Sequence, residues 1–101
     1  MFVYNITIKV IPEIEKEWVT WQQQEHIPAI MASGRFSEYK FYRLLEQDET
    51  DGITYIIQYF TSSLADYYHY IKETAPLLRQ KALDQWGNKF IAFRTLMQVV
   101  H

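Results

Sequence analysis

Two kinds of apolar pattern alternate along this chain of 101 residues, and their order restricts the fold. Segments with a period of two, which is typical of strands, cover residues 2–10, 36–47, 53–60 and 90–100. Segments with the 3.6-residue period of helices lie between the first two strands and between the last two. We therefore expect one α+β domain over residues 1–101, with the order βαββαβ and a four-stranded antiparallel sheet that carries both helices on one face.

The first helical segment has a clear start and an internal proline. Pro12 suits a first helical turn, where its missing N–H costs nothing. Pro28 removes the hydrogen bond to residue 24, so we expect the helix to kink or break at residues 25–27 and to stop at Gly34. The predicted buried stripe consists of Ile14, Trp18 and Trp21.

The second helical segment divides in two. Ser63 with Asp66 resembles a capping box, and Thr74-Ala75-Pro76 restarts the helix, which ends at Gly87. The predicted buried residues are Leu64, Tyr67, Tyr68 and Ile71 in the first part and Leu78, Ala82 and Trp86 in the second. We expect His69 and Tyr70 to lie at the edge of this face or in water.

The sheet face without helices is too apolar to face water. We assign to it Val3, Asn5, Thr7, Tyr39, Phe41, Arg43, Leu45, Ile56, Gln58, Phe60, Phe90, Ala92, Arg94 and Leu96. A patch of this size is typical of an interface, and its few polar members need partners when buried. We therefore predict a homodimer that pairs through the sheet face. The alternative is a monomer in which the assigned strand phases are wrong.

The composition argues against several classes of protein. Ten scattered Lys and Arg residues oppose twelve Asp and Glu residues, giving a net charge of −2, so we expect no nucleic-acid partner. The chain has no cysteine, which excludes disulfides, thiolate catalysis, zinc fingers and iron–sulfur clusters. We find no signal peptide and no apolar run of about 20 residues, so we expect a cytoplasmic protein without a membrane anchor.

An ordered set of short motifs resembles one protein family. The motifs are Trp18-x-x-Trp21, Glu25-His26-Ile27-Pro28, Gly34-x-Phe36, Tyr42-Arg43-Leu44-Leu45, Gln58-Tyr59-Phe60 and Phe90-x-x-Phe93-Arg94-Thr95. Together they are similar to an uncharacterised bacterial family, domain of unknown function 4286, over nearly the whole chain. That family resembles the ferredoxin-like, dimeric α/β-barrel superfamily, which includes cofactor-independent monooxygenases of polyketide quinones, haem-degrading enzymes and chlorite-dismutase relatives. The resemblance implies a fold and a dimer but no particular reaction.

His26 and Glu25 lie at the predicted kink and are the first candidates for a site. His26 could act as an acid, a base or a ligand in a pocket opened by Pro28, or it could simply bond a freed backbone carbonyl. On a regular helix Glu25 would lie about 20° from Ile14, on the buried stripe. It would then need a cation such as Arg43 or Arg94, unless the distortion turns it outward.

Arginine and aromatic side chains supply the remaining pocket candidates. Arg43 and Arg94 could bind an anionic ligand or form salt bridges across the interface. Trp21 and Tyr55 could line a pocket for a flat ligand, although aromatic residues at these spacings are more often core. The same two alternatives apply to Tyr4, Tyr39, Tyr42 and Tyr59.

Two functional hypotheses remain open. The first is a small-molecule-binding homodimeric barrel acting on an aromatic or haem-like compound, with His26 as the catalytic candidate and no resident cofactor. The second is a non-enzymatic structural or interaction dimer module. We predict no metal site, because His26, His69 and His101 are far apart and only His26 has an i−4 partner, the weak ligand Gln22.

Overall fold

A computed structural model describes residues 1–101 and confirms the ferredoxin-like α+β architecture. A 3₁₀ turn precedes the first helix, and a π-helical turn over Gln22–His26 joins that helix to the second. The strands and α-helices are β1 (Phe2–Val10), α1 (Glu15–Trp21), α2 (Ile27–Ala32), β2 (Glu38–Arg43), β3 (Ile53–Thr61), α3 (Leu64–Glu73), α4 (Ala75–Trp86) and β4 (Phe90–Gln98).

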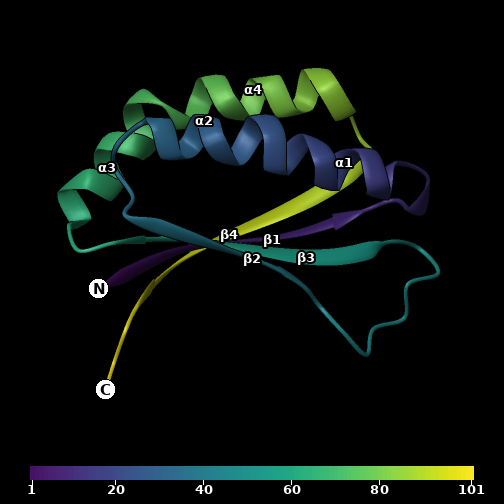
Figure 1. The fold of residues 1–101 in the computed structure, drawn as a ribbon, viewed down its shortest axis with the longest axis horizontal. Helices are drawn as coiled ribbons and strands as arrows, with labels where there is room; N and C mark the ends of the chain where they lie inside the picture. The colour runs from purple at the N-terminus through teal and green to yellow at the C-terminus, as the bar shows by residue number, and fades with distance from the viewer.

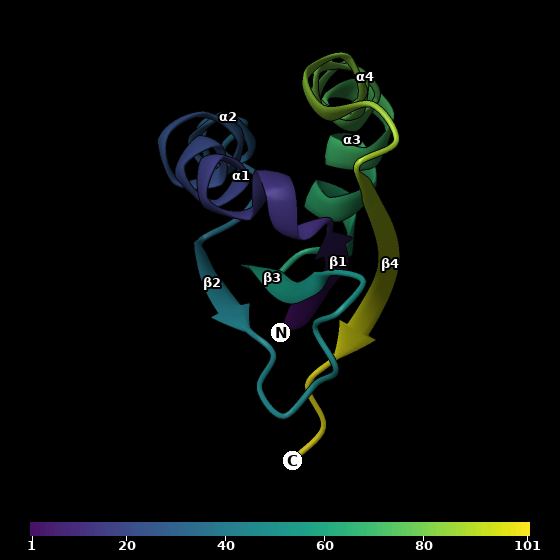
Figure 2. The same cartoon turned by 90° about the vertical axis from the view of Figure 1, so that its right-hand side faces the viewer.

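The four strands form one antiparallel sheet in the order β2-β3-β1-β4. All helices cover the same face of this sheet (Figure 1). Seen along the strands, α1 and α2 lie over the β2–β3 side, and α3 and α4 lie over the β1–β4 side (Figure 2). The loop between β2 and β3 and the C-terminal end both extend from the uncovered side (Figure 1). None of the helices combines the length and apolar character that crossing a bilayer requires.

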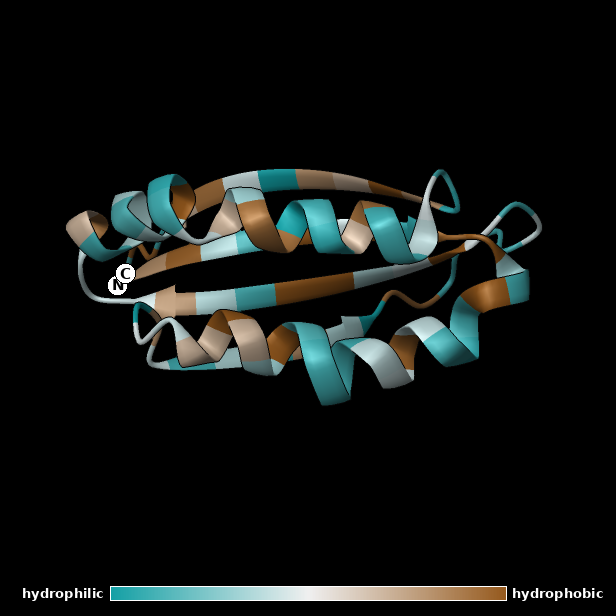
Figure 3. Ribbon diagram, turned by 90° about the horizontal axis from the view of Figure 1, so that it is seen from above, coloured by the Kyte–Doolittle hydropathy of each residue, from teal (hydrophilic) through white to brown (hydrophobic).

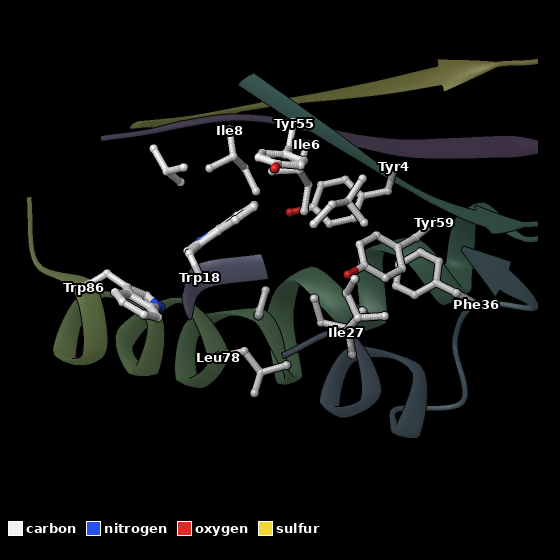
Figure 4. Packing of buried hydrophobic residues seen from close by; sticks show 14 of the residues in the cluster. Tyr4, Ile6, Ile8, Trp18, Ile27, Phe36, Tyr55, Tyr59, Leu78 and Trp86 are labelled. Atoms are coloured by element: carbon white, nitrogen blue, oxygen red, sulfur yellow. The ribbon is translucent and has the colours of Figure 1, made fainter. Parts of the chain in front are cut away.

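The core fills the space between the helices and the sheet (Figure 4). The helix-facing residues of β1 and β3 alternate with a period of two and are almost fully buried. Trp18 packs edge-on against Phe41, with ring centroids 6.0 Å apart, and lies 5.2 Å from Tyr55. At the other end of the sheet the aromatic rings of Tyr4, Phe36, Tyr59, Tyr67 and Tyr70 pack together.

The predicted strand phases are right for β1 and β3 and wrong for β2 and β4. Phe41 pairs with Ile57, and Arg94 pairs with Ile6, so both face the helices. The same correction moves Tyr39, Arg43, Phe90, Ala92 and Leu96 to the helix-facing side of the sheet. The uncovered face instead carries Val3, Asn5, Thr7, Lys9, Glu38, Lys40, Tyr42, Thr54, Ile56, Gln58, Phe60, Ile91, Phe93, Thr95 and Met97. Both phases of β4 contain large apolar residues, so its sequence pattern could not decide between them. In β2 the charged residues Glu38 and Lys40 share one phase, and this is the phase that faces away from the helices.

The predicted boundaries of the second helical segment are confirmed. The backbone N–H of Asp66 donates to Ser63 Oγ at 3.2 Å, and the chain leaves α4 at Gly87 with φ of 59°. The predicted inward face of α3 is partly wrong. Tyr70 is 2% exposed and packs against Tyr4, whereas Tyr68 is 59% exposed. Tyr67, Tyr70 and Ile71 follow the i, i+3, i+4 spacing of one helix face, and Tyr68 lies outside that face.

The strand over residues 36–47 is shorter than expected. Its pairing with β3 ends at Leu44, whose N–H donates to the carbonyl of Thr54 at 2.9 Å. Glu46 then adopts a φ of 58°, in the left-handed region that most residues avoid. This conformation turns the chain away from the sheet and into the exposed acidic loop.

Candidate functional site

The first two helices are joined by a π-helical turn rather than by a break. The N–H of Ile27 donates to the carbonyl of Gln22, five residues earlier. Pro28 has no N–H to donate, and its ring would crowd the carbonyl of residue 24 in a regular α-helix. The wider π-turn places one additional residue at this point, so the helix continues through Ala32 without the expected break.

The additional residue changes which side chains face the sheet. Up to Trp18 the buried stripe follows the regular helical spacing, and it then passes through the buried Gln22 to the buried Ile27. His26 is half-buried beside this stripe, and Glu25 is turned to solvent. Of the two alternatives for Glu25, exposure through the Pro28 distortion is therefore the one observed, and no ion pair involves it.

His26 stacks against Trp21. Their ring centroids are 4.6 Å apart and their planes differ by 24°. Trp21 also meets Trp86 edge-on at 5.8 Å, which ties the π-turn to the end of α4. Burial and, to a smaller extent, the positive charge of Arg94 together lower the pKa of His26 from 6.5 to about 4. The imidazole is therefore neutral near pH 7 and can accept a hydrogen bond or a proton.

A groove of about 480 Å³ lies between the two helical rows. The rows run side by side above the sheet (Figure 3). One wall comes from the first helical segment and the other from α4; the lining residues are Trp21, Glu25, His26, Ala29, Leu78, Lys81, Asp84 and Gln85. Its rim is charged, and its floor contains the Trp21–His26 stack. We call this space the outer groove.

A second, much smaller space lies deeper, between the helices and the sheet. Its volume is about 30 Å³, and most of its lining is apolar. Four polar side chains also line it, namely Gln22, His26, Tyr59 and Arg94. We call it the inner cavity. Trp21 and His26 are the two residues that line both the outer groove and the inner cavity.

Two polar atoms at the inner cavity have no hydrogen-bond partner. They are Gln22 Oε1 and the hydroxyl of Tyr59, and both are buried. The Tyr59 hydroxyl points from the sheet toward Ile27 in the helical layer (Figure 4). Burial is the main cause of a strongly raised Tyr59 pKa, so this hydroxyl keeps its proton. Since buried polar groups are nearly always hydrogen-bonded, we expect a polar group in the inner cavity that bonds these two atoms.

The structure brings together only some of the predicted pocket residues. Trp21, His26 and Arg94 line the inner cavity, and Glu25 lies in the outer groove. Arg43 and Tyr55 line neither space.

Arg43 and Tyr55 belong to a separate polar network at the β2 edge of the sheet. Arg43 Nη2 donates to both carboxylate oxygens of Glu49, at 2.8 and 3.0 Å, and its Nη1 lies 4.0 Å from Glu15. The Tyr55 hydroxyl donates to Glu15. Burial and this hydrogen bond raise the pKa of Tyr55 to about 12.

Sequence reasoning gave little weight to Gln22 and Tyr59. Tyr59 is one of five tyrosines that the strand pattern offers, and Gln22 was considered only as a weak metal ligand beside His26. The sequence feature that could have identified Gln22 as buried is its spacing, because Gln22 lies four residues after Trp18 on the buried stripe. No group of three or more His, Asp or Glu side chains comes together in a way that could hold a metal ion.

Comparisons with solved structures find the same fold at low sequence identity. An ethyl tert-butyl ether d (ethd) family protein from Bacillus halodurans matches with a TM-score of 0.70 and 13% identity, covering 99% of this chain and all of that one. SnoaB, a cofactor-independent oxygenase from Streptomyces nogalater, matches with a TM-score of 0.69 and 11% identity, covering 99% of this chain and 94% of that one. A dimeric ferredoxin-like protein from an uncultured marine organism matches with a TM-score of 0.58 and 13% identity, covering 99% of this chain and 95% of that one.

These likenesses define the class as a ferredoxin-like α+β domain. A search of curated protein sequences finds no match. The family model described as "Domain of unknown function (DUF4286)" matches residues 1–100, and the chain belongs to that family. The resemblance read from the motifs is thereby confirmed.

Proposed function

We propose that this protein is a homodimer of the bacterial cytoplasm that binds a flat aromatic compound between its helices and acts on it. The observation that carries the proposal is the meeting of the outer groove and the inner cavity at the Trp21–His26 stack. The outer groove, at about 480 Å³, falls within the range of roughly 300–1,000 Å³ usual for small-molecule sites. Trp21 supplies an aromatic surface against which a flat ring can stack.

His26 and Arg94 supply the chemistry of the proposed site. His26 is neutral near pH 7, so it can accept a proton from the ligand. When the ligand loses a proton, a negative charge develops on it. The cation of Arg94, which lines the inner cavity together with His26, stabilises this charge. The remaining lining is mainly apolar, which strengthens both electrostatic interactions. We assign His26 the role of proton acceptor and Arg94 the role of charge stabiliser.

Calorimetric titration of the purified protein tests this assignment. The probes are a set of flat two- and three-ring aromatic compounds and, for the haem-like class, haemin. We expect an aromatic probe to bind the wild type and to bind Trp21→Ala about tenfold or more weakly, because the stacking surface is lost. Leu83→Ala, an exposed position of α4 that lines neither space, is the control and should bind as the wild type does.

Two results count against the ligand proposal. One is the absence of binding by every probe, which leaves the non-enzymatic dimer module as the better account of the fold. The other is equal binding by the wild type and Trp21→Ala, which places the ligand elsewhere on the surface.

The proposed dimer pairs through the uncovered sheet face. Ile91 and Phe93 are 59% and 68% exposed there, and Met97 lies on the same strand face. Three strands of nine residues and one of six, about 4.8 Å apart, give a flat footprint of about 540 Å² for each protomer, and the projecting side chains add to this area. Stable interfaces bury about 800 Å² on each partner. One of the structural neighbours is described as a dimeric ferredoxin-like protein, which supports this arrangement.

Two amide side chains on the uncovered face are already hydrogen-bonded within the protomer. Gln58 Nε2 donates to Asn5 Oδ1 at 3.2 Å, and Asn5 Nδ2 donates to Thr7 Oγ1 at 3.3 Å. A partner sheet can therefore cover this face without leaving these amides unsatisfied. This pairing removes the main cost of burying Asn5 and Gln58 in a dimer.

Light scattering of Phe93→Asp tests the interface. A charge at the centre of the apolar strand face should convert a dimer to a folded monomer, checked by circular dichroism. Leu77→Asp is the matched control, because Leu77 is 62% exposed but lies on α4, away from the uncovered face. A wild-type monomer at micromolar concentration, or a Phe93→Asp dimer, contradicts the assignment.

A further inference from the structure

The inner cavity has room for a small polar group but not for a ring. A buried water needs about 10–15 Å³, so the 30 Å³ of the inner cavity admits one or two groups of that size. Yet two buried polar atoms, Gln22 Oε1 and the Tyr59 hydroxyl, are left without partners there. The simplest occupant is a single polar group that bonds both of these atoms.

The hydrogen-bonding character of the lining selects that group. The carbonyl oxygen of Gln22 only accepts, so the occupant has to donate a hydrogen. The guanidinium of Arg94 only donates, and the Tyr59 hydroxyl can do either, so the occupant also has to accept. A hydroxyl group does both. A carboxylate has no hydrogen for Gln22, and an ether oxygen has none either.

The route into the inner cavity connects this group to a larger ligand. Trp21 and His26 separate the cavity from the outer groove and line both. A substituent on a ring that lies in the outer groove enters the cavity when these two side chains move apart. The ring itself stays in the outer groove beside His26, the proton acceptor of the proposed function.

We propose that the inner cavity is the subsite for a ring-attached hydroxyl group, so that the ligand is a hydroxylated aromatic compound held by Gln22, Tyr59 and Arg94. This inference rests on the proposed function and narrows it to one substrate class. The Trp21–His26 stack is the gate that the hydroxyl passes, and Tyr59 and Gln22 are residues that determine specificity. A ring without a hydroxyl group fills the outer groove alone.

The test compares three probes of the same ring system by calorimetric titration: 2-naphthol, 2-methoxynaphthalene and naphthalene-2-carboxylate. We expect the wild type to bind 2-naphthol about tenfold or more tightly than the methyl ether and the carboxylate, because those two leave buried polar atoms unpaired. In Tyr59→Phe and in Gln22→Leu the preference for 2-naphthol should fall to about twofold or less. The binding of the methyl ether should change little.

Folding controls are available for both variants. The Tyr59 hydroxyl bonds nothing in the unliganded protein, so Tyr59→Phe should keep or raise the melting temperature. Tyr67→Phe is a matched tyrosine control, since Tyr67 is half-buried in the neighbouring aromatic cluster and does not line the cavity. It should keep the full preference for 2-naphthol.

The outcomes separate this inference from the proposed function. If 2-naphthol and its ether bind the wild type equally well, the inner cavity holds only a structural water; the hydroxyl subsite is then overturned, while binding in the outer groove stands. If the preference exists but persists in both Tyr59→Phe and Gln22→Leu, the hydroxyl is recognised elsewhere and the subsite is also overturned. If no probe binds at all, both proposals fall.

Discussion

His26 should make the stability of the fold depend on pH in a way that one substitution removes. Its pKa is about 4 in the folded protein against an ordinary value of 6.5. Between these two values the unfolded chain binds a proton that the folded protein does not, so acid favours unfolding. The group thus contributes stability above about pH 6.5, and this contribution is lost as the pH falls toward 4.

The magnitude follows from the two pKa values. At about 1.4 kcal/mol for each pH unit, the whole difference corresponds to about 3–4 kcal/mol. Between about pH 7 and about pH 4.5 the loss is about 2 kcal/mol, because the proton uptake is not complete at either limit. This is a large fraction of the 5–15 kcal/mol, roughly, that stabilises a domain.

Urea denaturation of the wild type and of His26→Phe measures this contribution. Phenylalanine keeps the aromatic stack on Trp21 and removes the titrating nitrogens, and all other titrating groups are common to both proteins. The difference between the two free energies of unfolding should therefore change by about 2 kcal/mol between the two pH values. Parallel pH profiles would refute the reasoning, as would a histidine NMR titration that places the His26 pKa near 6.5.

Three further substitutions probe the fold. Trp18→Ala should lower the free energy of unfolding by about 3–5 kcal/mol in urea titrations, because this 1%-exposed ring fills the centre of the core. Gly52→Ala should cost about 1–3 kcal/mol, since a Cβ there would lie 2.7 Å from the carbonyl oxygen of Val10, a backbone atom that cannot swing aside; unchanged stability would contradict this contact. Pro28→Ala restores the missing N–H donor, so we expect the π-turn to relax toward a regular helix. The pKa of His26, followed by NMR, should then rise from about 4 toward 6.5. An unchanged pKa would show that Pro28 does not hold the turn.

The sequence was sufficient for the order of elements because each signal was local. The period of two over residues 2–10 and the Ser63 cap are read within a few residues, and both are confirmed. The phase of a strand is not local when both of its faces are apolar. Arg94 faces the helices because β4 pairs with β1 in the register that sets Arg94 beside Ile6, and that register is a tertiary property.

The helical part of the candidate site likewise could not be predicted from local sequence patterns alone. Pro28 correctly marked where the helix is irregular, but a 3.6-residue period cannot indicate whether the chain breaks or gains a residue. The π-turn determines the outcome, since it keeps Glu25 in solvent and places His26 beside the buried Gln22. Gln22 and Tyr59 line the same cavity from a helix and from a strand, so no spacing along the chain could show that they lie together.

The two faces of the sheet differ in how their polar groups are satisfied, and this difference assigns them different roles. On the uncovered face Asn5 and Gln58 are hydrogen-bonded to each other, so a flat apolar partner can cover these two amides. On the helix-facing side Gln22 Oε1 and the Tyr59 hydroxyl are unpaired beside a cavity. A second copy of the chain on the uncovered face cannot supply the missing donor and acceptor, because the sheet lies between. A small ligand that enters between the helical rows can reach them, so the unpaired atoms favour a binding protein over a purely structural dimer.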